Sequence, residues 1–265
     1  MTLKNIFLQS SEFSFQSNIF YQRGLSRDTE FETLYLSLRE KENRVYPDEI
    51  VKILPEIPLQ HCLSKEWITR KFTVHKLIRY LREKKAPKIL EVGCGNGWLC
   101  HHLASIPGSE VVGMDVNETE LLQGARVFME TKNLFFTYTD IGIAILPFSH
   151  FDFIILSASI QYFRDIGILL SKLLGFLARD GEIHIVDSPV YDEADVESAH
   201  KRTEEYFDRA GFPLMKKYYH HHTWHMLRTF NLEILYNPDT FLNKMRKTFF
   251  LDSPFPWIKI INKER

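Results

Sequence analysis

The sequence predicts an α/β protein with a doubly wound, mostly parallel sheet, and three observations support this fold class. Short apolar runs typical of buried strands alternate with amphipathic helical patterns from residue 88 onward. The first of these runs breaks into a loop with three glycines, Gly93, Gly95 and Gly97. The strand–helix repeats are too few to close a barrel, so we expect an open sheet.

Length and composition favour one such domain with an added segment. The chain has 265 residues, 33 of them basic and 34 acidic, and a net charge of −1. We expect a helical N-terminal extension at 1–85 and an α/β domain at 86–265 with a lid-type insertion at about 188–225. The balanced charge gives no reason to expect a nucleic-acid partner.

The chain carries no feature that points to a membrane or an oxidising compartment. No run approaches the length of a membrane span. The three cysteines are odd in number and form no CxxC pair, so we expect reduced thiols and a cytoplasmic location. The sequence does not predict the oligomeric state.

The N-terminal part shows helical patterns after an aperiodic start. Residues 1–27 lack periodicity and are expected to form an irregular arm. Thr29 and Glu32 form a capping box that begins a helix. A short helix is expected at 48–54, and Ser64 can cap a third helix with one apolar stripe.

The glycine-rich loop follows a predicted strand at 89–92 and precedes a predicted helix at 98–105. Glycine permits positive φ and close approach of the backbone to a ligand. The pattern is E-x-G-x-G-x-G and differs from the dinucleotide fingerprint G-x-G-x-x-G. Glu91 before the loop, and the absence of a Gly-Lys-Ser/Thr motif, argue against a phosphate ligand.

This pattern resembles the class I S-adenosylmethionine-dependent methyltransferases, over about residues 86–265. In that family the loop faces the methionine end of the cofactor. The resemblance implies a Rossmann-like sheet of seven strands in the order 3-2-1-4-5-7-6, with the last-named pair antiparallel. It implies S-adenosylmethionine as cofactor and S-adenosylhomocysteine as product. The residues carried over as cofactor contacts or as residues that shape the pocket are Glu91, Gly93, Cys94, Gly95 and Gly97.

The second predicted strand, 110–114, ends at Asp115, about twenty residues after the loop. A carboxylate at this place can accept hydrogen bonds from both ribose hydroxyls, and Val116 lies beside it. The structural alternative is that Asp115 caps the next helix. Asn117 is better placed for that role, so Asp115 is free for a ligand.

The third predicted strand, 134–138, ends near Asp140. Taken alone, such an aspartate is usually a turn residue. The resemblance implies instead that Asp140 accepts from the adenine amino group and that Ile141 packs on the adenine ring.

The fourth predicted strand, 151–157, is followed by a segment expected at the rim of the cleft. Ser157 is a predicted cofactor contact, and Gln161 and Tyr162 are predicted substrate contacts. The Asn/Asp-Pro-Pro-Tyr/Phe segment of enzymes that methylate nucleic-acid amines is absent here, which disfavours a nucleic-acid base as acceptor.

A helix at 165–178, a strand at 181–187 and a charged helix at about 192–210 follow, and Tyr206 of the charged helix is a predicted substrate contact. The adjacent histidines near 220 point in different directions and have no acidic partner at a regular offset, so no metal is expected. The candidates for a general base are His221, His222 and Tyr162. Two final strands, at 232–236 and 256–261, are expected on either side of a helix at about 239–247.

Trp67 and Arg70 share a helix face in the N-terminal extension. The family resemblance places such a face over the cleft and makes both residues candidate substrate contacts. The alternative is a buried tryptophan and a solvated arginine.

The predicted function is transfer of a methyl group from S-adenosylmethionine to a small molecule whose identity the sequence does not give. One alternative is a binding protein that keeps the fold and the cofactor without catalysis. Aminopropyl transfer would require an acidic pair near the fourth strand, where Ser157, Ser159 and Gln161 stand instead. The glycine spacing disfavours a nicotinamide oxidoreductase.

Overall fold

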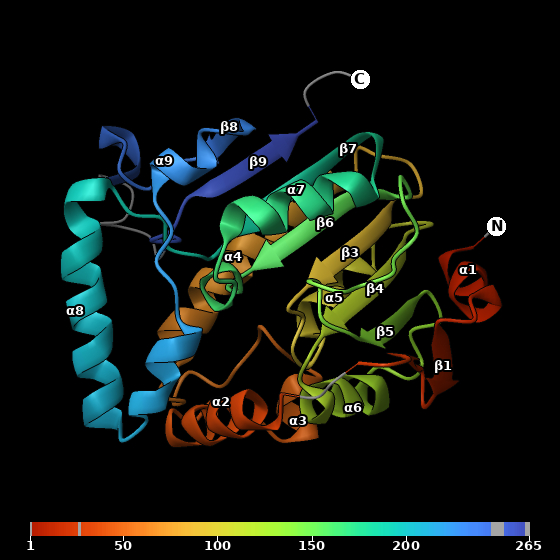
Figure 1. Ribbon diagram of the computed structural model, residues 1–265, viewed down its shortest axis with the longest axis horizontal. Helices are drawn as coiled ribbons and strands as arrows, with labels where there is room; N and C mark the ends of the chain where they lie inside the picture. The colour runs from red at the N-terminus through yellow and green to blue at the C-terminus, as the bar shows by residue number, and fades with distance from the viewer. Residues whose placement is uncertain (1, 26–27, 245–251, 263–265) are drawn as a thin grey trace.

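The computed structural model describes residues 2–25, 28–244 and 252–262. These residues form one nine-stranded sheet with helices on both faces (Figure 1). The strands are β1 Phe13–Gln16, β2 Ile19–Gln22, β3 Lys88–Val92, β4 Glu110–Asp115, β5 Leu134–Tyr138, β6 Phe151–Ser157, β7 Leu177–Val186, β8 Asn231–Tyr236 and β9 Trp257–Ile261. The α-helices are α1 Leu3–Gln9, α2 Thr29–Lys41, α3 Asp48–Val51, α4 Ser64–Leu81, α5 Trp98–Leu103, α6 Glu118–Val127, α7 Ile166–Phe176, α8 Glu193–Ala210 and α9 Trp224–Leu227. Two short 3₁₀ helices are η1 Ile160–Tyr162 and η2 Pro213–Tyr218.

The strand order across the sheet is β1-β2-β5-β4-β3-β6-β7-β9-β8. From β5 to β8 this is the predicted order, and β9 runs antiparallel to both β7 and β8. The prediction of seven strands was wrong because β1 and β2 extend the sheet, with β2 parallel to β5. The segment expected to be an irregular arm therefore contributes α1 and two strands. Its aromatic side chains give it a packed face: the rings of Phe7, Phe20 and Phe135 lie 5.2–5.4 Å apart.

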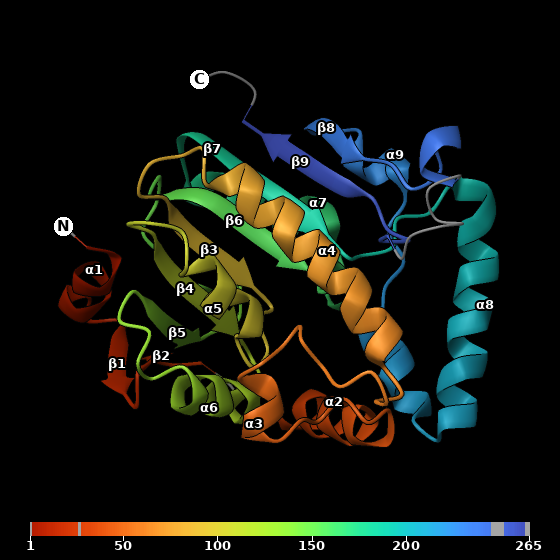
Figure 2. The same cartoon turned by 180° about the vertical axis from the view of Figure 1, so that it is seen from behind.

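The sheet is buried on both faces because successive strand residues point to opposite sides. In β3, Ile89 contributes to one core cluster and Leu90 to the other, and both are fully buried. Helix α7 covers the face turned to the viewer in Figure 1, and α4 and α5 cover the opposite face in Figure 2. Hydrophobic burial on two faces explains why these strands read as continuous apolar runs.

A third, smaller hydrophobic cluster lies beyond the carboxyl ends of the central strands. It joins α2, α8 and η2 through Leu38, Phe207 and Met215, with Tyr162 packed against it. Figure 1 shows α2 and α8 on the side toward which the arrowheads of β3 and β6 point. The insertion after β7 therefore packs with the N-terminal helices, close to the edge of the sheet where ligands bind in open α/β folds.

Several element boundaries differ from expectation for local reasons. Helix α2 is capped by Asp28, whose carboxylate accepts from the Phe31 N–H at 3.0 Å, and not by Thr29. Asn117 caps α6 as predicted, accepting from the Glu120 N–H. The helix expected at 239–247 lies partly outside the described residues.

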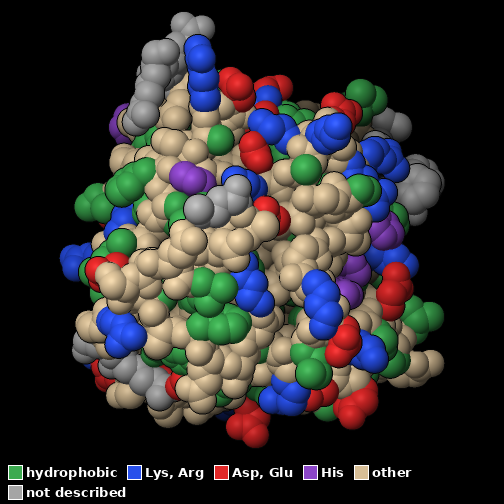
Figure 3. Space-filling model, turned by 90° about the vertical axis from the view of Figure 1, so that its right-hand side faces the viewer, with side chains coloured by type: hydrophobic (Ala, Val, Ile, Leu, Met, Phe, Trp, Pro, Cys, Tyr) green, Lys and Arg blue, Asp and Glu red, His purple; other side chains and the backbone are tan. Residues whose placement is uncertain are grey.

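On the side of the molecule where β1 lies, basic and acidic side chains are interspersed (Figure 3).

Candidate active site

The glycine-rich loop between β3 and α5 is held by main-chain contacts to β4. The N–H groups of Gly93 and Cys94 both donate to the Met114 carbonyl, at 2.9 and 3.0 Å. Gly93, Gly95 and Gly97 all have positive φ. A Cβ at position 97 would lie 2.5 Å from the Phe136 ring, so Gly97 permits close packing of the loop on β5.

Three neighbouring cavities open at this edge of the sheet, and we name them by position. The inner cavity, of about 260 Å³, lies beside the ends of β4 and β5. The loop cavity, of about 100 Å³, lies at the glycine-rich loop. The outer chamber, of about 680 Å³, lies between α2, α4 and α8. Ala158 lines all three, and Gly93 lines the first two.

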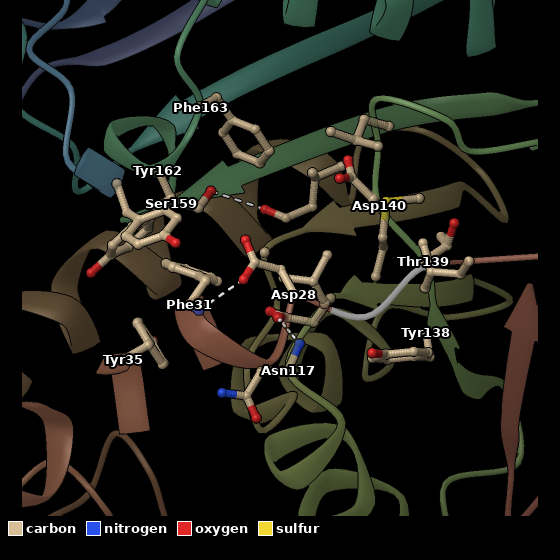
Figure 4. Close-up of a pocket in the computed structure, with 18 of the residues that line it drawn as sticks. Asp28, Phe31, Tyr35, Asn117, Tyr138, Thr139, Asp140, Ser159, Tyr162 and Phe163 are labelled. Carbon is tan, nitrogen blue, oxygen red and sulfur yellow. Dashed lines mark hydrogen bonds between the residues drawn. The ribbon is translucent and has the colours of Figure 1, made fainter. Parts of the chain in front are cut away.

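The inner cavity combines carboxylates with aromatic and aliphatic walls. Of the predicted cofactor contacts it is lined by Gly93, Asp115, Val116, Asp140 and Ile141. Figure 4 shows Asp140 on one side of the cavity and the rings of Phe31, Tyr35 and Tyr162, the first two from α2, on the other. This arrangement suits a flat, largely apolar group with a few polar edges.

Asp115 links the cavity to the loop. Its carboxylate accepts from the Gly95 N–H at 2.7 Å and from the Asn117 N–H at 2.8 Å. Desolvation raises the pKa of Asp115, while these backbone hydrogen bonds oppose the shift. Asp140 is exposed, and its side chain accepts from the Gly142 N–H at 2.6 Å, so it also takes part in the turn that the sequence suggested.

The loop cavity is lined by charges of both signs. Arg39, Arg44 and Arg70 face it from α2, the following loop and α4, and Glu91 and Glu120 face it from β3 and α6. A cavity lined by both arginine and glutamate side chains can bind a zwitterion, because each of its charged groups finds a partner of opposite charge. Cys94, Gly95, Ser157 and Trp67 also line this cavity.

Glu91 is buried and accepts a hydrogen bond from the Cys100 thiol at 2.9 Å. Burial raises the pKa of Glu91 to about 8, despite the opposing effect of the thiol. Desolvation also raises the pKa of the neighbouring Glu120. Without a bound cation, the Glu91 carboxyl is therefore largely protonated at neutral pH.

The outer chamber is lined by four of the five predicted substrate contacts, Arg70, Gln161, Tyr162 and Tyr206. The fifth, Trp67, lines the loop cavity. The Gln161 amide donates to the Ala158 carbonyl at 2.7 Å, and its buried Oε1 has no hydrogen-bond partner among the described residues. The Tyr206 hydroxyl donates to Glu42. Tyr162 also lines the inner cavity, so its ring lies between the two spaces.

The structure does not bring every predicted residue to a cavity. His222 is buried and contacts the Ile160 carbonyl at 2.9 Å, and His221 contacts the Thr203 hydroxyl at 2.9 Å. Neither histidine lines any of the three cavities, and neither does Gly97. Desolvation lowers the pKa of His221 to about 4, which leaves its imidazole neutral. Tyr162 is the one base candidate that faces the cleft.

Sequence reasoning missed the wall contributed by α2. Phe31, Tyr35 and Arg39 recur at every fourth position, so they share one face of that helix. Helical spacing alone assigns these residues to the helix that begins near Thr29 and gives them no role in a cleft. The sequence signal for this wall was Arg39, a charged residue on the same helix face as two aromatic residues. Trp67 is buried and donates to the Tyr46 hydroxyl at 2.8 Å, and both Trp67 and Arg70 line the loop cavity.

Among residues 2–25, 28–244 and 252–262, no three His, Cys, Asp or Glu side chains are grouped to hold a metal ion. No helix there has both the length and the apolar character needed to cross a membrane.

Comparison with known proteins identifies the central part of the chain. Residues 90–183 match the model of a methyltransferase domain. The ubiquinone biosynthesis O-methyltransferase of Bradyrhizobium diazoefficiens is 25% identical over 125 residues, covering 47% of this chain and 48% of that protein. The malonyl-[acyl-carrier protein] O-methyltransferase of Bacillus cereus is 30% identical over 117 residues, 42% of this chain and 43% of that protein. The chain thus matches about half the length of these relatives.

A solved structure extends the likeness in fold. The geranyl diphosphate C-methyltransferase of Streptomyces coelicolor superposes with a TM-score of 0.54 at 14% identity, covering 77% of this chain and 84% of that one. At this identity the likeness shows the fold alone. With the domain match and the strand order, it leads to one conclusion: residues 90–183 are a match to a methyltransferase domain, and the sheet around them has the class I methyltransferase fold.

Proposed function

We propose that the protein binds S-adenosylmethionine across the inner and loop cavities and transfers its methyl group to a small molecule held in the outer chamber. The observation that carries the proposal is the division of the cleft. A space with aromatic walls and three carboxylates adjoins a space lined by side chains of both charges, and Ala158 lines both of them and a larger chamber.

The inner cavity fits the adenosine part of the cofactor. Asp115 would accept from the ribose hydroxyls, because its two oxygens keep acceptor capacity beyond the two N–H groups they hold. Asp140 would accept from the adenine amino group. Ile141, which is buried, would pack on the ring from one side, and the α2 aromatic residues would enclose it from the other.

The loop cavity fits the amino-acid end. Glu91 would accept from the ammonium group, and the approach of that cation would favour the ionised carboxylate. Arg39 is the arginine best suited to bind the carboxylate, since Arg44 and Arg70 both contact Glu66, at 2.7 and 3.1 Å. Among the carboxylates of the described residues, Arg39 contacts Glu42 at 3.5 Å, and its guanidinium lies 4.9 Å from the centre of the Tyr35 ring.

The chemistry that the bound cofactor supplies is an electrophilic methyl group on a sulfonium. The contribution of the chain is chiefly alignment, since holding two reactants in line can supply several kcal/mol of the barrier. Tyr162 lies where the inner cavity meets the chamber, so it can orient an acceptor and take its proton. The cover formed by the N-terminal helices and the insertion at about 188–225 would exclude water.

The names of the relatives support a methyl acceptor of small size, as in ubiquinone biosynthesis, and offer no reason to expect nucleic acid as partner. The cysteines Cys62, Cys94 and Cys100 are all free thiols, which supports a cytoplasmic location for this activity.

The test is calorimetric titration of the purified protein with S-adenosylmethionine and S-adenosylhomocysteine, with a nicotinamide dinucleotide as control. Micromolar binding of the first two alone is the expected result. Absence of binding in a folded protein would overturn the proposal. Acceptors are then screened by transfer of labelled methyl groups, and cofactor binding with no turnover on any acceptor would favour the alternative of a binding protein without catalysis.

A further inference from the structure

The outer chamber has the size and walls of a small-molecule site. Its volume of about 680 Å³ lies within the range of about 300–1,000 Å³ typical of ligand pockets. Leu38, Phe207, Tyr191, Tyr219 and Phe255 supply much of its apolar surface. An acceptor here would therefore present an apolar or aromatic body.

The charges around this chamber do not balance. Five cationic side chains line it, from Arg39, Arg44, Lys65, Arg70 and Arg202. The acidic side chains in its lining are three, Glu42, Glu66 and Asp187. An excess of positive charge in a partly enclosed space attracts anions.

Each acidic side chain of the chamber lining already has an ion-pair or hydrogen-bond partner in the protein. Glu66 binds both Arg44 and Arg70, and these contacts, working against desolvation, lower its pKa to about 2. Glu42 lies 3.1 Å from Arg44. Asp187 accepts from two hydroxyls, of Thr73 at 2.9 Å and Ser253 at 3.2 Å, and burial raises its pKa. No acid of the lining remains for the other cations.

Two of the cations are free to meet a ligand. Lys65, in the first turn of α4, and Arg202, in α8, contact no carboxylate among the described residues, and Arg202 donates only to the Ser198 hydroxyl, at 3.0 Å. Neither lines the loop cavity, so neither is needed for the amino-acid end of the cofactor. They come from two elements on either side of the chamber, one in the N-terminal extension and one in the insertion.

We propose that the outer chamber selects an anionic acceptor, a small molecule with an apolar or aromatic body and a carboxylate, phosphate or sulfonate group that Lys65 and Arg202 bind. This inference rests on the proposed function, because it names the substrate class of the same site. The two cations are specificity residues: they bind the acceptor away from the methyl group and take no part in bond making.

The experiment uses two fluorescent probes with the same aromatic body. Anilinonaphthalenesulfonate carries a sulfonate, and N-phenylnaphthylamine lacks it. Each is titrated into the full chain saturated with S-adenosylhomocysteine, so that the cofactor cavities are filled. We expect one saturable site that binds the sulfonate at least about tenfold more tightly than the uncharged probe.

The variant K65M/R202M removes both free cations. It should weaken binding of the sulfonate by at least about fivefold and leave the uncharged probe unaffected. The matched control is R79M/K201M, which removes two exposed cations from the same two helices outside the chamber and should change neither affinity.

Equal affinity for both probes, absence of saturable sulfonate binding, or equal weakening by both double variants would overturn the inference. Failure of the proposed function is a separate result. It would show as absent S-adenosylhomocysteine binding in calorimetry of the unmodified protein, before any probe is added.

Discussion

Two walls of the cofactor cleft differ in how they are built. The loop wall runs from β3 through the glycine-rich loop to the ends of β4 and β5, and backbone hydrogen bonds from Gly93, Cys94 and Gly95 hold it. The cover wall, from α2 and α4, presents aromatic rings and arginines, and side-chain contacts hold it, such as the two hydrogen bonds from Arg44 to Glu66.

This difference predicts which substitutions affect both folding and ligand binding and which affect ligand binding alone. Substitutions in the loop wall should affect folding or the binding of any adenosine ligand, because its shape depends on main-chain geometry. Substitutions in the cover wall should affect only ligands that reach it. Methylthioadenosine lacks the amino-acid end, so it would reach the α2 rings at the inner cavity but not the arginines at the loop cavity, and it separates these two parts of the cover wall.

The largest effect is expected for Gly97→Ala in the loop wall. The residue has φ +73°, and the new Cβ would meet the Phe136 ring. Left-handed backbone and overpacking together should cost about 2–4 kcal/mol of the free energy of unfolding. Chemical denaturation measures this loss. Gly175→Ala in α7, where the nearest atom is 3.6 Å away, is the control expected to be neutral or stabilising.

Asp115→Asn should weaken S-adenosylmethionine and methylthioadenosine alike, by about 1.5–3 kcal/mol, because both ligands carry the ribose that its carboxylate would bind. Calorimetric titration of the variant with each ligand measures the two affinities. Unchanged affinity in a folded variant would remove Asp115 from the site, and loss of S-adenosylmethionine binding alone would place it at the amino-acid end.

Arg39→Met in the cover wall should weaken S-adenosylmethionine about tenfold, or about 1.4 kcal/mol, through loss of a charge-assisted hydrogen bond. Methylthioadenosine should bind as before. Lys52→Met, which removes an exposed cation away from the cavities, serves as the control. Equal weakening of both ligands would contradict the assignment of Arg39 to the amino-acid end of the cofactor.

Glu91→Gln should change the pH dependence of stability. Because the pKa of Glu91 is raised from its ordinary 4.5 to about 8, the folded state keeps a proton that the unfolded state releases between these values. Stability therefore falls as pH rises through this window, by less than about 1.4 kcal/mol per pH unit. The midpoint temperature of thermal unfolding should change less with pH in the glutamine variant than in the unmodified protein. An identical slope in both proteins would contradict a protonated Glu91.

The sheet could be predicted where local sequence carries the signal. The strands β3 to β6 are apolar runs with sharp ends, and their bounds agree with prediction to within one residue. The strands β1 and β2 were missed because each has only four residues, and they are stabilised less by a local pattern than by pairing of β2 with β5 and of β1 with β2. The placement of His221 and His222 away from the cleft depends on how η2 and α8 pack, which no spacing encodes.

By itself, the sequence determined the central strands, the glycine-rich loop and the acids at the ends of two strands, because strand periodicity and positive φ are local properties. The order of those strands was implied by the family resemblance and not by any local pattern. Only the tertiary structure decided which side chains face those acids. Arg39, Arg70 and Arg202 come from three helices far apart in sequence, and packing of α2, α4 and α8 around one cleft brings them together. Hydrophobic contacts that hold those helices thereby set the charge of the chamber.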